Sequence, residues 1–148
     1  TWKGLELSVY LQGVAGNKIF NANKIALTGM SAAYNQLNDV LSRWHGEGTS
    51  TSMPRAVYGD PNQNNRVSDR YVENGAYLRL KSISLAYNVP QQWLRALTLS
   101  SARITFSCEN VATITGYSGF DPEVGVNGID LSSYPISRTF NIGLNLNF

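Results

Sequence analysis

Apolar and polar residues alternate along several segments of this sequence. In residues 5–12 (LELSVYLQ) every odd position is apolar, and residues 102–110 repeat the pattern with Ile104, Phe106 and Cys108 on the apolar side. The most regular segment is 139–148 (TFNIGLNLNF), in which every even position is apolar. Because side chains point alternately to the two faces of a strand, each segment predicts a β-strand with one apolar face.

A fourth strand is predicted over residues 76–89, which are rich in β-forming residues. Its apolar phase changes from the even positions Leu78 and Leu80 to the odd positions from Ile83 onward. One extra residue in a strand produces such a change, so we expect a β-bulge near Lys81 and Ser82. The four segments together predict an all-β, antiparallel structure.

The connections between these strands differ in length. Residues 15–74 and 111–135 form long links, whereas residues 90–100 form a short one. Long extracellular loops and short periplasmic turns alternate in this way in outer-membrane barrels. In the first long link, Tyr34, Leu37, Leu41 and Trp44 follow helical spacing, which predicts a short helix after an N-cap at Ser31 and before Gly46.

Composition supports strands that separate lipid from a polar interior. Only 15% of residues are charged, below the roughly 25% of average soluble domains. The net charge of +2 and the scattered Lys and Arg residues argue against nucleic acid as a partner. No window approaches the roughly 18 apolar residues of a membrane helix, so any membrane span is expected to be β.

Three strings carry a resemblance to a known family. They are SDRYVENGAYLRLKSISLAYNVP at 68–90, ENVATITGYSGFDPEVG at 109–125 and YPISRTFNIGLNLNF at 134–148. In this order they resemble the C-terminal part of SusC/RagA-type TonB-dependent transporters. The resemblance implies that residues 1–148 form about four C-terminal strands of a transmembrane β-barrel of about 22 strands, with the plug domain and the N-terminal strands outside this chain.

The family resemblance also implies a function and partners. It implies an importer of oligosaccharides or peptides in the outer membrane of Gram-negative bacteria of the Bacteroidota type, without enzymatic activity or a cofactor. A SusD-type surface lipoprotein would cap the barrel, and the TonB complex would act through the N-terminal part. The barrel assembly machinery would read the alternating apolar residues before an aromatic terminus, here Phe140, Ile142, Leu144, Leu146 and Phe148.

Two groups of residues are candidates for ligand contact. The polar sides of the strands would face the lumen and line a substrate path, or only hydrate the lumen and contact a plug. These residues are Glu6, Ser8, Gln12, Arg103, Thr105, Ser107, Glu109, Asn141, Asn145 and Asn147. Aromatic residues of the long loops would stack on sugars, touch a lipoprotein lid, or pack within the loops; they are Trp44, Tyr58, Tyr117, Phe120 and Tyr134.

The sequence gives little support for a catalytic site or a metal site. The only histidine, His45, could form a triad with Asp39 or Asp60, but an exposed histidine is the preferred interpretation. Asp121 and Glu123 could bind calcium or serve a glycosidase, although an aspartate before proline more often forms a turn. We expect the single cysteine, Cys108, to pack as a small apolar residue.

Aromatic residues are expected at one end of the strands. Trp2, Tyr87, Trp93 and Phe148 should lie near one boundary, where an aromatic girdle forms at a membrane surface.

Two alternative folds remain open. A water-soluble, carbohydrate-binding β-sandwich would bury the same apolar rows between two sheets. The barrel of a siderophore receptor or an adhesin is a third possibility.

Overall fold

The computed structural model describes residues 2–50, 52–95 and 98–148. The chain divides into two compact units. The sheet unit comprises Thr1–Ala15, Ala76–Gly116 and Pro135–Phe148, and the loop unit comprises Gly16–Gly75 and Tyr117–Tyr134. None of the described helices has the length and hydropathy needed to cross a bilayer.

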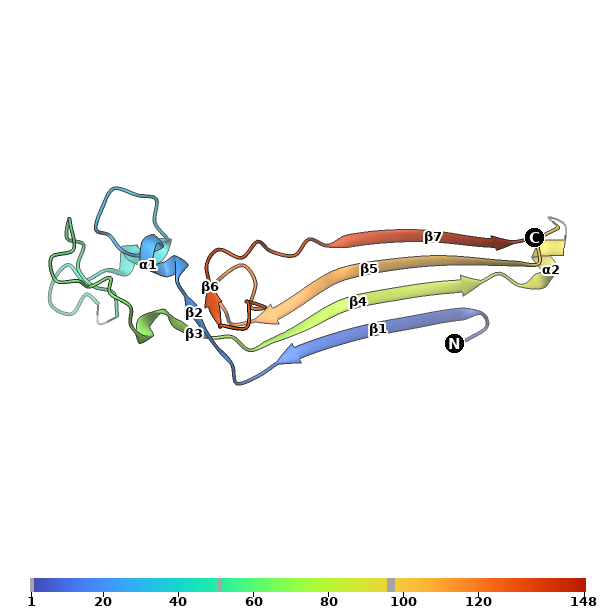
Figure 1. Ribbon diagram of the computed structural model, residues 1–148, viewed down its shortest axis with the longest axis horizontal. Helices are drawn as coiled ribbons and strands as arrows, with labels where there is room; N and C mark the ends of the chain where they lie inside the picture. The colour runs from blue at the N-terminus through green and yellow to red at the C-terminus, as the bar shows by residue number, and fades with distance from the viewer. Residues whose placement is uncertain (1, 51, 96–97) are drawn as a thin grey trace. The chain divides into compact units, whose positions relative to one another are not determined.

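Four long strands form the sheet unit. They are β1 (Leu5–Val14), β4 (Tyr77–Asn88), β5 (Ser101–Thr115) and β7 (Thr139–Asn147). The strands pair antiparallel in the order β1-β4-β5-β7 and run side by side (Figure 1). The four predicted strands and their antiparallel arrangement are therefore confirmed.

A β-bulge interrupts β4 at the predicted place. Against β1, Tyr10 pairs with Ser82 and Leu11 with Leu80, so that Lys81 is the extra residue. A second bulge follows in β5, where the two residues Asn110 and Val111 lie opposite Lys81. Asn110 has a φ of 53°, a left-handed conformation that asparagine tolerates better than most residues.

The second bulge explains an error in the predicted end of β5. The sequence pattern ended this strand at Asn110, but β5 continues to Thr115. The bulge changes the phase of the alternation, so that Ala112 and Ile114 rejoin the apolar face beside Leu80 and Leu78. The long link therefore begins after Thr115 and not at Val111.

Strand register aligns the apolar residues in rows across the sheet. One row runs from Leu7 through Leu85 and Phe106 to Ile142, and the neighbouring rows are equally apolar. Phe106 and Phe140 stack across adjacent rows, with 6.3 Å between their ring centroids. Leu7 is 65% exposed and Ile142 is 82% exposed. This apolar face is not covered as the β-sandwich alternative would require.

Aromatic residues gather at one end of the sheet. Tyr87 pairs with Leu5 near the end of β4, and Trp2 forms an isolated bridge with the same leucine. Trp93 lies in α2 (Gln91–Leu94), in the short link between β4 and β5. Phe148 follows β7, whose Asn147 pairs with the first residue of β5. The four aromatic residues expected at one boundary are therefore at the same end of the sheet.

The loop unit contains a small three-stranded sheet of order β3-β2-β6. Its central strand, β2 (Lys18–Asn21), pairs antiparallel with β3 (Val72–Asn74) and parallel with β6 (Ile129–Asp130). Ile19 and Tyr71 are almost completely buried in this unit. The sheet thus joins the two long links, since Phe20 of the first pairs with Ile129 of the second.

The predicted helix between Ser31 and Gly46 is wrong. Its region contains only a short 3-10 helix, η1 (Asn38–Ser42), and Leu37 and Arg43 on either side have extended backbones. The amide of Leu37 bonds to the carbonyl of Leu27, a contact outside the predicted helix. Apolar residues at helical spacing are therefore not enough to form a helix here, because packing against other elements supplies most of a helix's stability.

The helices of the loop unit lie elsewhere. A five-residue helix, α1 (Asn23–Leu27), follows β2, and a single 3-10 turn, η2 (Asp69–Tyr71), precedes β3. Both elements are too short to give a periodic signal in the sequence. They nevertheless carry Lys24 and Tyr71, which take part in the contacts described below.

Candidate functional site

The predicted lumen-facing residues lie together on one face of the sheet unit, opposite the apolar face. Ser8, Ser84, Ser107 and Asn141 form a continuous row across all four strands. Asn141 Nδ2 lies 3.5 Å from Ser107 Oγ, which is a long hydrogen bond between neighbouring strands. Short polar side chains therefore occupy the middle of this face, which we call the polar face.

A charged network lies at the end of the polar face near Leu5. Arg103 Nη2 is 2.6 Å from Glu6 Oε2, and Asn88 bonds to both side chains. These residues come from β5, β1 and the intervening β4, respectively. Ala86, the β4 partner of Glu6, is buried and has a small side chain. Two of the predicted path residues are thus bonded to each other.

Close packing also limits side-chain size on the polar face. Gly143 of β7 pairs with Thr105 of β5. A β-carbon at Gly143 would lie only 2.5 Å from Thr105 Oγ1, so a larger residue there would displace the threonine. At the edge of the sheet, Asn147 Nδ2 donates to Ser101 Oγ at 2.6 Å.

The sequence analysis missed Arg79, which is the most enclosed cationic side chain of the polar face. Arg79 is only 3% exposed, and its Nε donates to Thr113 Oγ1 at 3.0 Å. Its guanidinium carbon lies 5.5 Å from the ring centroid of Tyr77, and the Tyr77 hydroxyl accepts a hydrogen bond from Gln12. The alternation of Leu78 and Leu80 already placed Arg79 on the polar face, so this signal was available.

A polar cluster organises the loop unit around Glu73. Lys24 Nζ lies 2.9 Å from Glu73 Oε1, and Ser118 donates to the carboxylate through both its amide and its hydroxyl. Asn21 Nδ2 donates to the same oxygen at 3.1 Å. Burial acts to raise the pKa of Glu73, but the bonds from Lys24, Ser118 and Asn21 outweigh it and lower the pKa.

A second buried carboxylate joins β6 to the segment after β5. Tyr117 Oη donates to Asp130 Oδ2 at 2.6 Å, and Asp130 Oδ1 accepts from the amides of Ser132 and Ser133. Burial and the bond to Asp130 raise the pKa of Tyr117. Burial acts to raise the pKa of Asp130, yet its hydrogen bonds prevail and lower it. The cluster therefore keeps the tyrosine neutral and the aspartate ionised.

The five predicted loop aromatics fall into two classes. Tyr58, Phe120 and Tyr134 are highly exposed, and Trp44 is 37% exposed. Tyr117 is buried through its bond to Asp130, so it packs within the loop unit and is not available to a ligand. Of the alternatives that the sequence left open, internal packing thus applies to Tyr117.

The remaining candidates have structural environments. The ring Nδ1 of His45 lies 3.0 Å from the Arg43 carbonyl oxygen, and the imidazole is exposed. Asp121 Oδ1 accepts from the Glu123 amide, which is the predicted turn. Cys108 is buried in the apolar row, as expected. Across residues 2–50, 52–95 and 98–148, no three His, Cys, Asp or Glu residues are grouped as metal ligands.

Comparison with known proteins identifies several relatives. The chain is 33% identical over 158 aligned residues to the TonB-dependent receptor P3 of Formosa agariphila, with 99% of the chain covered. It is also 33% identical to the TonB-dependent receptor SusC of Bacteroides thetaiotaomicron, with 68% covered. No protein-family model matches the sequence. The chain spans 15% of the length of P3 and 10% of the length of SusC.

Solved structures agree with these sequence relatives. The RagAB peptide transporter superimposes with a TM-score of 0.85 at 28% identity and covers the whole chain. The RagAB peptide importer in its open-open state gives a TM-score of 0.84. In both cases the chain accounts for 16% of the larger structure. The relatives and structures described above are named receptors, a transporter and an importer.

Proposed function

Because this chain belongs to the SusC/RagA-type TonB-dependent receptors of the outer membrane, we propose that it forms part of the barrel wall of a TonB-dependent importer. The observation that carries the proposal is the pair of opposite faces on one antiparallel sheet. The exposed apolar rows suit contact with lipid, and the polar face suits a hydrated lumen. The long links would be extracellular and the link containing α2 periplasmic.

The imported molecules would be oligosaccharides or peptides. The polar face offers the hydrogen-bonding groups that both classes require, and its ion pair and Arg79 add fixed charges. Charged residues inside a membrane-spanning region commonly mark a functional path. In the proposal, Ser8, Ser107 and Asn141 belong to the path or contact the plug.

A SusD-type lipoprotein is the proposed extracellular partner. Its proposed contacts are the exposed loop aromatics Tyr58, Phe120 and Tyr134, because aromatic residues are enriched at protein interfaces. The TonB complex would act through the N-terminal part of the full receptor. The barrel assembly machinery would recognise β7, whose apolar side chains are exposed in an unbroken alternation.

Uptake by cells provides the test. The full receptor would be expressed in a strain that lacks its own copy, and the entry of labelled oligosaccharides and peptides would be measured with and without a proton uncoupler. The proposal predicts uptake of one class that depends on both the receptor and the proton gradient. Uptake that is unchanged without the receptor for every substrate would contradict the importer function.

A further inference from the structure

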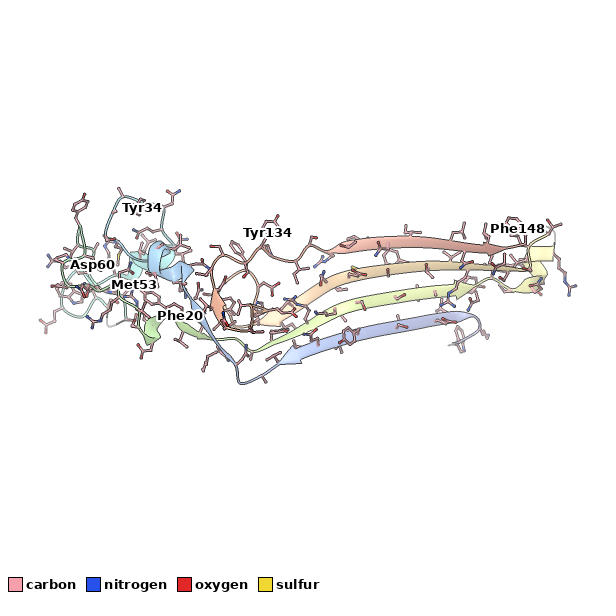
Figure 2. The ribbon with its side chains drawn as sticks, in the orientation of Figure 1. Phe20, Tyr34, Met53, Asp60, Tyr134 and Phe148 are labelled. Carbon is pink, nitrogen blue, oxygen red and sulfur yellow. The ribbon has the colours of Figure 1, made fainter. Side chains whose placement is uncertain are left out.

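A turn of the loop unit brings several arginine residues together. The Trp44 amide donates to the Met53 carbonyl at 3.0 Å, and the His45 amide donates to Thr49 Oγ1. These bonds hold residues 43–45 beside residues 53–55, in the part of the loop unit where Figure 2 labels Met53. Arg43 and Arg55, twelve residues apart in the sequence, therefore border the same surface.

Two adjoining hollows of about 440 Å³ and 460 Å³ share Trp44 and Arg55 in their lining. The first also contains Ser52, Asn64 and Arg70, and the second also contains Arg43. We call this combined surface the arginine groove. It comprises Arg43, Trp44, Ser52, Arg55, Asn64 and Arg70.

The arginine groove has uncompensated positive charge. No Asp or Glu lines either hollow, and in the part of the chain that the structure describes none of its three arginines forms an ion pair. Lys24 and Arg103, in contrast, each lie within 3 Å of a carboxylate oxygen. Each guanidinium has five N–H donors. Arg43 donates to the Val40 carbonyl at 3.4 Å, and Arg70 donates to the Tyr71 hydroxyl and lies over the Tyr71 ring, which leaves other donors of both groups for a ligand. The groove is therefore prepared to accept an anion.

The chemistry of the groove identifies the class of ligand. Guanidinium groups bind carboxylates and sulfates through paired hydrogen bonds. The half-exposed indole of Trp44 offers a flat apolar surface, while Ser52 and Asn64 offer hydrogen bonds to hydroxyl groups. A charged sugar chain combines anionic groups, apolar ring faces and many hydroxyls, and so matches all three features.

We propose that the arginine groove binds the carboxylate or sulfate groups of an acidic oligosaccharide. Trp44 packs against a sugar ring, and Arg43, Arg55 and Arg70 hold its charged substituents. The proposal rests on the proposed importer function, because it specifies the substrate class that the extracellular side selects. It adds a binding site in the loops to the path along the polar face.

Direct binding to the full receptor, purified in detergent, tests the groove. Calorimetry would compare four probes: an oligogalacturonate, a sulfated galactan oligosaccharide, a neutral galactan oligosaccharide of equal length, and an acidic peptide. Wild-type receptor should bind at least one acidic sugar about tenfold more tightly than the neutral sugar. The difference should shrink as salt is added, because ions screen exposed charges.

Single substitutions locate the effect. Arg55→Gln should weaken binding of the acidic sugar about tenfold, since a hydrogen bond to a charged group is lost. Arg66→Gln, an exposed arginine of the same loop outside the groove, should leave the affinity within about twofold. Comparing the affinity for the oligogalacturonate with that for the sulfated galactan oligosaccharide shows whether the groove prefers carboxylate or sulfate groups.

Two results would contradict the proposal that the arginine groove binds acidic oligosaccharides. One is equal affinity for neutral and acidic sugars with no effect of Arg55→Gln, and the other is an Arg55-dependent preference for the acidic peptide alone. In either case, receptor-dependent uptake in cells would still show an importer. Absence of any receptor-dependent uptake, with acidic-sugar binding intact, would instead contradict the importer function and leave the groove standing.

Discussion

The two units differ in which residues they expose and which they bury. In the sheet unit, large apolar side chains such as Leu7, Ile114 and Ile142 are exposed. In the loop unit, Asn21 and the carboxylate of Asp130 are buried, together with Ile19 and Tyr71. One sequence thus contains one region with its apolar residues outside and another with polar residues inside.

The difference follows from what surrounds each unit in the proposed receptor. Lipid solvates an apolar sheet face, so exposure of these rows carries no hydrophobic penalty there. The loop unit buries few of its apolar residues and is held instead largely by hydrogen bonds to buried polar groups. In the proposed receptor the sheet unit therefore depends on its membrane, and the loop unit depends on the polar networks around Glu73 and Asp130.

The largest expected effect comes from placing charge on the apolar face. Ile142→Lys should destabilise the folded barrel by about 2 to 4 kcal/mol and reduce the assembled receptor, because lysine would face the bilayer near mid-membrane. Asn141→Lys, on the same strand but the polar face, is the matched control and should be milder. Urea unfolding of the full receptor in lipid vesicles measures both. Equal losses would refute the assignment of faces.

The buried polar network of the loop unit provides the second test. Tyr117→Phe removes the hydroxyl that bonds to Asp130, and it should destabilise the loop unit by roughly 1.5 to 3 kcal/mol, as for hydrogen bonds to charged groups. Hydrogen exchange of the Ser132 and Ser133 amides would report the local free energy of opening. Tyr134→Phe, at an exposed tyrosine, should leave exchange unchanged. Similar exchange in both variants would show that the network is not stabilising.

Acid should destabilise the part of the loop unit around Glu73. The native pKa of Glu73 lies below its ordinary value of 4.5, so its stabilising contribution is complete above about pH 4.5 and is lost as the pH falls through the native pKa. Exchange of the Ser118 amide, corrected for intrinsic pH dependence, should therefore accelerate in acid. Glu73→Gln should abolish most of this pH dependence. Its persistence in that variant would assign the acid sensitivity to another group.

The smallest effect is expected on the polar face. Asn145→Ser keeps a short polar side chain toward the lumen, so stability should change by less than about 0.5 kcal/mol. The same vesicle unfolding experiment measures it beside Ile142→Lys. A loss as large as that of the lysine variant would mean that the polar face is packed against another part of the receptor.

Sequence reasoning succeeded where structure is periodic. Alternation placed the four long strands, put Glu6 and Arg103 on the same face, and located the bulge at Lys81. It failed at the second bulge, because the strand beyond Asn110 resumes with only a few residues in the new phase. It also missed Arg79, although the same alternation placed that residue on the polar face.

In the loop unit, where apolar and polar residues do not alternate regularly, the sequence predicted little of the structure. Tyr117 and Tyr134 are both loop tyrosines, and only the fold shows that one is buried against Asp130 while the other is exposed. The helix expected around Leu37 did not form, and the Leu37 amide bonds instead to the carbonyl of Leu27, which precedes the predicted helix.

The sequence by itself determined the four long strands, their two faces and the family, since these depend on local alternation and on strings of residues that resemble the family. Only the tertiary structure decided which charges pair, as in Glu6 with Arg103 and Lys24 with Glu73. It also decided which arginines, such as Arg43 and Arg55, have no carboxylate partner among the described residues. The physical reason is the separation in sequence of the residues that interact. Alternation is fixed between adjacent residues, whereas pairing depends on side chains that the fold brings together across tens of residues.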